Sequence, residues 1–197
     1  MFFGQGDSTI LSVALFWIVF YTWFGSEIFI GWKLRARDGA TQSDAGSRSV
    51  LITSIWLGVA LGIALSEAMP SSAFTSGRRL LFYIGLALMV IGMALRWYSI
   101  RVLGRWFTTS VAIRPDQKVV AGGPYRWIRH PSYTGGLLTV LGIFVCLTNP
   151  LSLVGMLPPL AGYAYRIRVE ERTLVRSLGQ PYLSYMRRTK RLLPFLV

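Results

Sequence analysis

The chain has 197 residues, enough for one domain, and its 53% hydrophobic content and mean hydropathy of +0.48 exclude an ordinary soluble domain. Its formal net charge of +13 would indicate nucleic acid in a soluble protein, but here the charge must first be mapped against a membrane. Cys146 is the only cysteine, which excludes an intrachain disulfide, and its apolar surroundings predict a small buried residue.

Five apolar segments predict an all-α, polytopic integral membrane protein. The first, residues 8–32, is long enough to cross a hydrocarbon core, which takes about 20 residues. It lacks the basic start and the cleavage site of a signal peptide. The other segments are residues 50–69, 80–98, 133–148 and 151–165. The pair Asn149-Pro150 predicts a tight turn, so the last two segments should form a helical hairpin.

Three features inside these segments carry specific expectations. Glu27, near the inner end of the first span, should either snorkel to the interface or be paired. Gly85 and Gly92 should let the third span approach a neighbouring helix closely. Pro158 and Pro159 should kink the fifth span, either to shape a cavity or as a matter of packing.

Positive charge falls almost entirely on one side of the expected membrane. With five spans, all of the 21 lysines and arginines except Arg78 and Arg79 lie on that side. The positive-inside rule then places the N-terminus outside and the C-terminus in the cytoplasm. If the protein is bacterial, the membrane would be the inner membrane of the cell. This distribution accounts for the charge without nucleic acid, and the basic tail at residues 187–191 could also hold anionic lipid.

Residues 122–136, GGPYRWIRHPSYTGG, contain the only histidine, His130, between two apolar segments. Pro131 disfavours helical backbone at the residue before it and is tolerated in the first turn, so a helix should begin near Pro131. His130 and Tyr133 should therefore lie at a helix N-terminus, where free N–H groups favour an anion.

The hairpin should bring residues about forty apart in sequence into one pocket. The loop around His130 and the segment around Glu170 and Glu171 flank the inner ends of the last two spans. Arg166 and Glu170 stand four residues apart and should meet on one helix face, as a plain ion pair or as a functional pair at the membrane boundary.

Several kinds of active site are excluded or disfavoured. A single histidine and the lack of a Cys-His cluster argue against a metal site. A Gly-x-Ser-x-Gly elbow is absent, and neither a Walker loop nor a dinucleotide fingerprint after a strand is found.

Three motifs in order resemble the isoprenylcysteine carboxyl methyltransferase family and the related membrane phospholipid methyltransferases. They are Gly123-Pro124-Tyr125, the run RHPSYTG at residues 129–135, and RIRVEERTL at residues 166–174. The resemblance covers about residues 103–194 and is closest to the compact, microbial-type members. It implies an N-terminal anchor at residues 1–100 and a catalytic region at residues 101–197, together in one folded unit.

The resemblance implies methyl transfer from S-adenosyl-L-methionine to the carboxylate of an isoprenylcysteine or of another isoprenoid or lipid acceptor. The cofactor pocket would face the cytoplasm, between the loop before the fourth span and the C-terminal tail. Cofactor contacts would come from Gln117, Val120, Gly123, Tyr125, Arg129, His130, Tyr133, Glu171, Tyr182 and Tyr185. Arg166 would hold the acceptor with Glu170 beside it. No metal, no nucleic acid and no obligatory protein partner are implied beyond a lipophilic or prenylated substrate in membrane lipid.

Two other functions remain open from the sequence. A sterol-type membrane reductase has a similar C-terminal pocket with a His-x-x-Tyr pattern and uses NADPH, although such enzymes usually have more spans. A non-enzymatic membrane protein could bind anionic lipid through its basic face. The identity of the cofactor distinguishes these functions. The acceptor, the oligomeric state and the separate roles of Glu170 and Glu171 also stay open.

Overall fold

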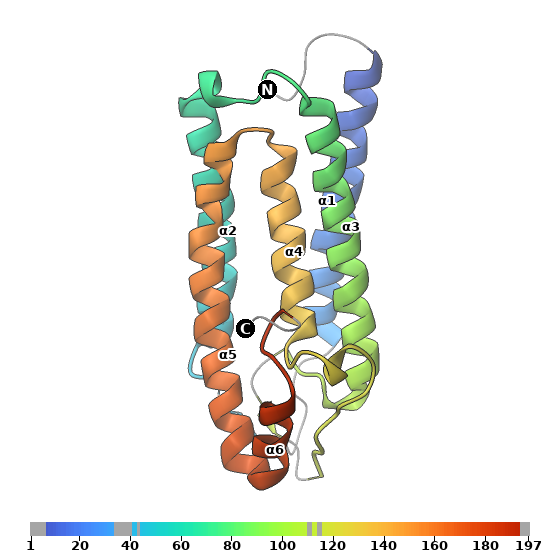
Figure 1. Ribbon diagram of the computed structural model, residues 1–197, viewed down its shortest axis with the longest axis vertical. Coiled ribbons are helices and arrows are strands. Elements are labelled where there is room, and N and C mark those ends of the chain that lie inside the picture. The colour runs from blue at the N-terminus through green and yellow to red at the C-terminus, as the bar shows by residue number, and fades with distance from the viewer. Residues whose placement is uncertain (1–6, 34–40, 43, 110–111, 114–115, 194–197) are drawn as a thin grey trace.

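A computed structural model describes residues 7–33, 41–42, 44–109, 112–113 and 116–193, so the basic residues Arg35, Arg37 and Arg114 lie outside the described residues (Figure 1). The α-helices are α1 (Asp7–Lys33), α2 (Ser47–Ala68), α3 (Arg78–Leu103), α4 (Pro131–Cys146), α5 (Leu157–Leu178) and α6 (Gln180–Arg188). Short 3-10 helices are η1 (Pro70–Ser72), η2 (Gly104–Trp106), η3 (Gly123–Arg126) and η4 (Pro150–Met156). The two-residue strands β1 (Thr41–Gln42) and β2 (Ala112–Ile113) pair antiparallel. The described chain is therefore helical, as the apolar segments predict.

The long helices run up and down in alternation (Figure 1). α3 packs along α4, α2 packs along α5 and η4, and α1 joins the bundle mainly through α3. The described parts of the segments between α1 and α2 and between α3 and α4 gather with α6 at one end, which we call the inner end. The pairing of β1 with β2 joins those two loops.

Glycines bring α3 and α4 into backbone contact. A Cβ atom added at Gly85 would lie 2.6 Å from Cys146 Sγ and 2.8 Å from the carbonyl oxygen of Gly142. One added at Gly92 would lie 2.6 Å from the carbonyl oxygen of Gly135. The expectation that Gly85 and Gly92 allow close helix approach is confirmed.

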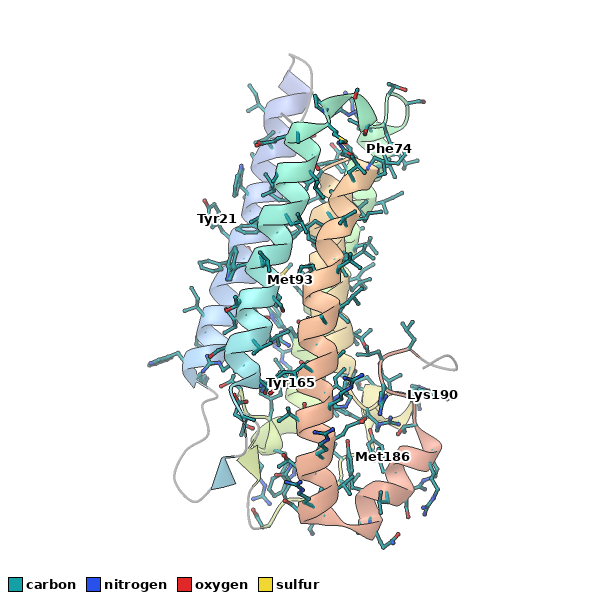
Figure 2. All side chains as sticks on the ribbon, turned by 90° about the vertical axis from the view of Figure 1, so that its left-hand side faces the viewer. Tyr21, Phe74, Met93, Tyr165, Met186 and Lys190 are labelled. Atoms are coloured by element: carbon teal, nitrogen blue, oxygen red, sulfur yellow. The ribbon has the colours of Figure 1, made fainter. Side chains whose placement is uncertain are left out.

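The outer surface of the bundle is apolar, and Tyr21 of α1 points away from it (Figure 2). Within the described residues, three helices are long and apolar enough to cross a membrane, at Ile10–Lys33, Ser47–Ala68 and Arg78–Trp106. α4 is apolar but has 16 residues. The first three expected spans thus correspond to α1, α2 and α3, whereas the hairpin falls short of that criterion.

The hairpin turn is confirmed, but its second arm differs from expectation. The Asn149 side chain accepts a hydrogen bond from the Leu151 N–H at 3.0 Å and caps η4. The expected kink at Pro158 and Pro159 is wrong, because both lie in the first turn of α5. A proline there loses no intrahelical hydrogen bond, so α5 continues without a proline in its interior. The irregular backbone lies before them, in η4.

Candidate active site

The C-terminal tail fixes the loop that leads into α4. Ile128 and Lys190 form a parallel bridge, and the Arg129 and His130 N–H groups donate to the carbonyl oxygens of Lys190 at 2.7 Å and Arg191 at 3.0 Å. Figure 2 shows Met186 and Lys190 on this tail, alongside the lower half of α5. Pro131 begins α4, as expected, and directly follows His130. The tail, which binds His130, therefore also fixes the position of the α4 N-terminus.

The Gly-Pro-Tyr motif forms η3 and is held from two sides. Gly123 has φ +55°, which favours glycine, and an added Cβ would lie 3.1 Å from Val102 Cγ2. Tyr125 is buried, and its carbonyl oxygen accepts a hydrogen bond from the Tyr185 hydroxyl at 2.7 Å. Burial raises the pKa of Tyr185 to about 12, so its hydroxyl remains a donor at neutral pH.

Glu171 is buried, with 6% of its side chain exposed, and binds three basic side chains. Its Oε1 accepts from Arg129 Nε at 2.8 Å and lies 3.3 Å from His130 Nε2, while its Oε2 accepts from Arg191 Nε at 3.1 Å. Burial alone raises the pKa of Glu171, but the hydrogen bonds from His130 and Arg129 outweigh it and lower the pKa to about 2. Glu171 therefore joins the loop, the tail and α5.

Tyr133 lies between Arg166 and Glu170. Its hydroxyl accepts from Arg166 Nε at 3.1 Å and donates to Glu170 Oε2 at 2.5 Å. The Tyr133 ring stacks on that of His130, with 5.3 Å between centroids and 5° between planes. The expected contact between Arg166 and Glu170 is thus made through the Tyr133 hydroxyl rather than as a direct ion pair.

Arg166 also binds two segments that sequence reasoning missed. Its Nη1 donates to Asp44 Oδ1 at 2.7 Å and to Ser47 Oγ at 2.8 Å, and its Nη2 donates to the Thr109 carbonyl oxygen at 2.8 Å. Every nitrogen of the guanidinium is engaged. The available signal was Asp44 itself, one of two acids, with Asp38, in a loop that carries four basic residues.

A second ion pair, whose partner the sequence did not identify, joins α1 to α3. Arg96 donates from Nε and Nη2 to the two carboxylate oxygens of Glu27, with 2.7 Å between Nη2 and Oε2. Its Nη1 donates to Ser132 Oγ at 2.9 Å. Of the two alternatives for Glu27, the paired one is confirmed.

One cavity of about 600 Å³ lies among these groups and is lined by many of them. Its polar part is lined by Trp106, Gln117, Val120, Tyr125, Arg129, His130, Glu170, Tyr182 and Tyr185. Its apolar part, between α1 and α2, is lined by Trp23, Phe24, Ile28, Leu51, Ile55 and Trp56. Glu27, Arg96, Tyr133 and Arg166 also line it. All of the expected site residues line this cavity except Gly123 and Glu171.

This arrangement can hold two chemically different ligands, or two parts of one ligand. The polar part offers a carboxylate, a histidine and several hydroxyls, and the apolar part offers aromatic and aliphatic walls. Among the described residues, no group of histidine, cysteine, aspartate and glutamate side chains could hold a metal ion.

Comparison with known proteins matches these features to one family. The family model described as "Isoprenylcysteine carboxyl methyltransferase (ICMT) family" matches residues 84–176. Protein-S-isoprenylcysteine O-methyltransferase B of Arabidopsis thaliana is 32% identical over 75% of this chain and 78% of its own length. A probable protein-S-isoprenylcysteine O-methyltransferase of Oryza sativa subsp. indica is 34% identical over 77% of this chain and 84% of its own length.

A solved structure is similar as well. It is the eukaryotic intramembrane Ras methyltransferase ICMT, with a TM-score of 0.58 and 28% identity over 75% of this chain. This chain spans 52% of that protein. On the sequence matches, which cover most of the plant relatives, the chain belongs to the isoprenylcysteine carboxyl methyltransferase family.

Proposed function

We propose that this chain transfers a methyl group from S-adenosyl-L-methionine to the carboxylate of an isoprenylcysteine-like, lipophilic acceptor. The observation that carries the proposal is the cavity that joins a polar part beside Glu170 to an apolar part between α1 and α2. A soluble cofactor needs polar surroundings and a lipid tail needs apolar ones. Methyl transfer also requires the methyl donor and the acceptor to lie next to each other, so the two parts must be joined.

The residues of the polar part fit the cofactor. The cavity of about 600 Å³ is within the usual range of ligand sites, about 300–1,000 Å³. Glu170 has 29% of its side chain exposed and would balance a cationic ligand. Tyr182, Tyr185 and Trp106 would pack against an adenosine group, and His130 and Tyr133 would lie at the α4 N-terminus beside it. Glu171 would keep Arg129 and His130 in position from behind the cavity wall.

When bound, S-adenosyl-L-methionine supplies an activated methyl group that a carboxylate oxygen can accept without a metal ion or a general base. The chain then has to orient the acceptor and exclude water. Arg96 and Arg166 are two of the cations on the cavity wall, and a guanidinium can orient a carboxylate because it presents parallel N–H donors. The aromatic walls around Trp23 and Trp56 would cover the lipid tail and keep water from the reacting groups.

The contacts of Arg166 favour a positioning role, in addition to the substrate contact that the resemblance implies. Its hydrogen bonds to Asp44, Ser47 and Thr109 hold the loops of the inner end over the cavity. Through Tyr133 it also orients Glu170. Arg166 would therefore act on the cofactor site as well as on the acceptor.

The inner end would face the cytoplasm, where the cofactor is made. The distribution of basic residues supports this orientation, with the N-terminus outside. The five long helices alternate in direction, which supports five crossings if η4 and the apolar start of α5 complete the last one. The acceptor would then enter from the inner half of the membrane.

The test is a calorimetric titration of S-adenosylhomocysteine, then of NADPH, into detergent-purified protein, followed by an assay of methyl transfer to N-acetyl-S-farnesylcysteine. Binding of S-adenosylhomocysteine but not NADPH, together with ester formation, is expected. The named relatives are methyltransferases, and none supports the reductase alternative. Binding of NADPH alone, or no transfer to any prenylated carboxylate, would overturn the proposal.

A further inference from the structure

Glu27 is a charged side chain at a depth where charges are costly. It stands about 9 Å before the end of α1 at Lys33, at a rise of roughly 1.5 Å per residue. Ionisable groups inside apolar spans are rare and commonly mark functional sites. A buried ion pair gives little net stability, because desolvation offsets the attraction between its charges. The pair of Glu27 with Arg96 therefore calls for a role beyond holding helices together.

Arg96 has a second partner besides Glu27. Its Nη1 donates to Ser132 Oγ at 2.9 Å and lies 3.4 Å from the Ser132 carbonyl oxygen, both at the start of α4. α4 is in turn packed tightly on α3 through glycines. If Glu27 turned away, the guanidinium would still be held on the cavity wall.

Glu27 is the more accessible and the less firmly placed partner. Its side chain is 30% exposed, compared with 13% for Arg96, and both line the cavity. It belongs to α1, which joins the bundle mainly through α3. The face of Arg96 that presents Nε and Nη2 is thus already a carboxylate site, and a carboxylate that can withdraw occupies it.

We propose that Glu27 is a built-in competitor for Arg96: it holds Arg96 in the empty site, yields it to the acceptor carboxylate, and takes it back when that carboxylate has become a neutral methyl ester. This inference rests on the proposed function. In the reaction, the new oxygen–carbon bond forms as the carbon–sulfur bond breaks, with the electron pair left on sulfur. The acceptor thereby loses the negative charge with which it competed.

The competition has opposite effects on substrate and product. Displacement of Glu27 weakens the apparent affinity for the acid, because only a fraction of the empty protein has Arg96 available. An ester carries no charge and cannot displace Glu27 to the same extent. Restoring the pair after methylation therefore favours release of the ester.

The test compares binding of N-acetyl-S-farnesylcysteine and of its methyl ester to purified protein saturated with S-adenosylhomocysteine. Glu27→Gln should bind the acid about tenfold more tightly, since the competing charge is gone. It should also bind the ester more tightly, since Arg96 can then hold the ester carbonyl. In turnover, kcat should fall as release slows, while kcat/KM should rise, because Arg96 no longer has to be freed from Glu27 before the acid binds. Glu67→Gln, on the exposed part of α2, is the matched control and should change neither ligand's affinity.

A double variant separates competition from a structural role. In Arg96→Gln, which lacks the contested guanidinium, adding Glu27→Gln should no longer strengthen acid binding. If Glu27→Gln instead weakens binding of both ligands and lowers kcat/KM, the pair is only structural and the inference fails. Ester formation by the wild-type protein in that same experiment would leave the proposed function intact, whereas no ester formation by any variant would count against the proposed function itself.

Discussion

Glu170 and Glu171 are adjacent in sequence, yet Glu170 lines the cavity and Glu171 lies behind its wall. Successive residues on a helix are not on the same face, so α5 directs the two carboxylates to different surroundings. Glu171 binds Arg129, His130 and Arg191, whereas Glu170 accepts from the Tyr133 hydroxyl. Among the described residues, Oε1 of Glu170 has no protein partner, which leaves it available to a ligand.

Exchanging each carboxylate for its amide should therefore have different results. Glu170→Gln should leave the unfolding midpoint nearly unchanged and weaken S-adenosylhomocysteine binding about tenfold, the loss of one charged contact. Glu171→Gln should cost about 3–5 kcal/mol of stability, because it leaves Arg129 without its buried counter-ion. Thermal unfolding in detergent and calorimetry on the same samples measure both. Equal loss of stability in the two variants would contradict the assignment.

Acid should also weaken the fold through Glu171. Its pKa in the folded protein is about 2, below the ordinary value of 4.5, so its stabilising effect is present above pH 4.5 and is lost as pH falls from 4.5 towards 2. Glu171→Gln should be less stable than wild type at neutral pH and should lose less stability over that interval. The measurement is the unfolding midpoint against pH, with Glu67→Gln as control. Parallel curves for wild type and Glu171→Gln would rule this out.

Local chemistry made much of the fold readable from the sequence. Pro131 fixes the start of α4 because proline restricts its neighbour and suits a first turn. Asn149-Pro150 fixes the hairpin for a similar reason. Pro158 and Pro159 led to a wrong prediction of a kink, because the effect of a proline depends on where its helix begins. Here η4 ends at Met156, so α5 begins just before the two prolines.

The partners of charged residues could not be read in the same way. Glu27 meets Arg96, and Asp44 meets Arg166, across long sequence separations. Each pairing depends on how the helices are rotated about their axes, and near-uniformly apolar spans carry little information on rotation. Spacing alone likewise put Arg166 next to Glu170, whereas Tyr133 from another helix lies between them.

The Tyr133 hydroxyl provides a third prediction, because among the described residues its two hydrogen bonds alone link the charged groups of Arg166 and Glu170. Tyr133→Phe should weaken S-adenosylhomocysteine binding about tenfold, since Glu170 loses the donor that orients it, the equivalent of about 1.4 kcal/mol. Tyr165→Phe is a suitable control. Tyr165 lies on an exposed part of α5, and its hydroxyl donates to the Ala45 carbonyl oxygen. An unchanged affinity in Tyr133→Phe would show that Glu170 is held by other means.

The contact between α3 and α4 gives a prediction about stability alone. Gly85→Ala should destabilise the protein by about 1–3 kcal/mol, because the new Cβ would lie 2.7 Å from the Cys146 backbone nitrogen and 2.8 Å from the Gly142 carbonyl oxygen. Backbone atoms cannot move aside as a flexible side chain could. Gly25→Ala, in α1, is the control: nothing lies within 4 Å of its Cβ, and alanine favours helix, so its stability should be unchanged or higher. The unfolding midpoint in detergent measures both. If Gly85→Ala were as stable as Gly25→Ala, α3 and α4 would have to lie farther apart, and Arg96 would no longer be held on Ser132.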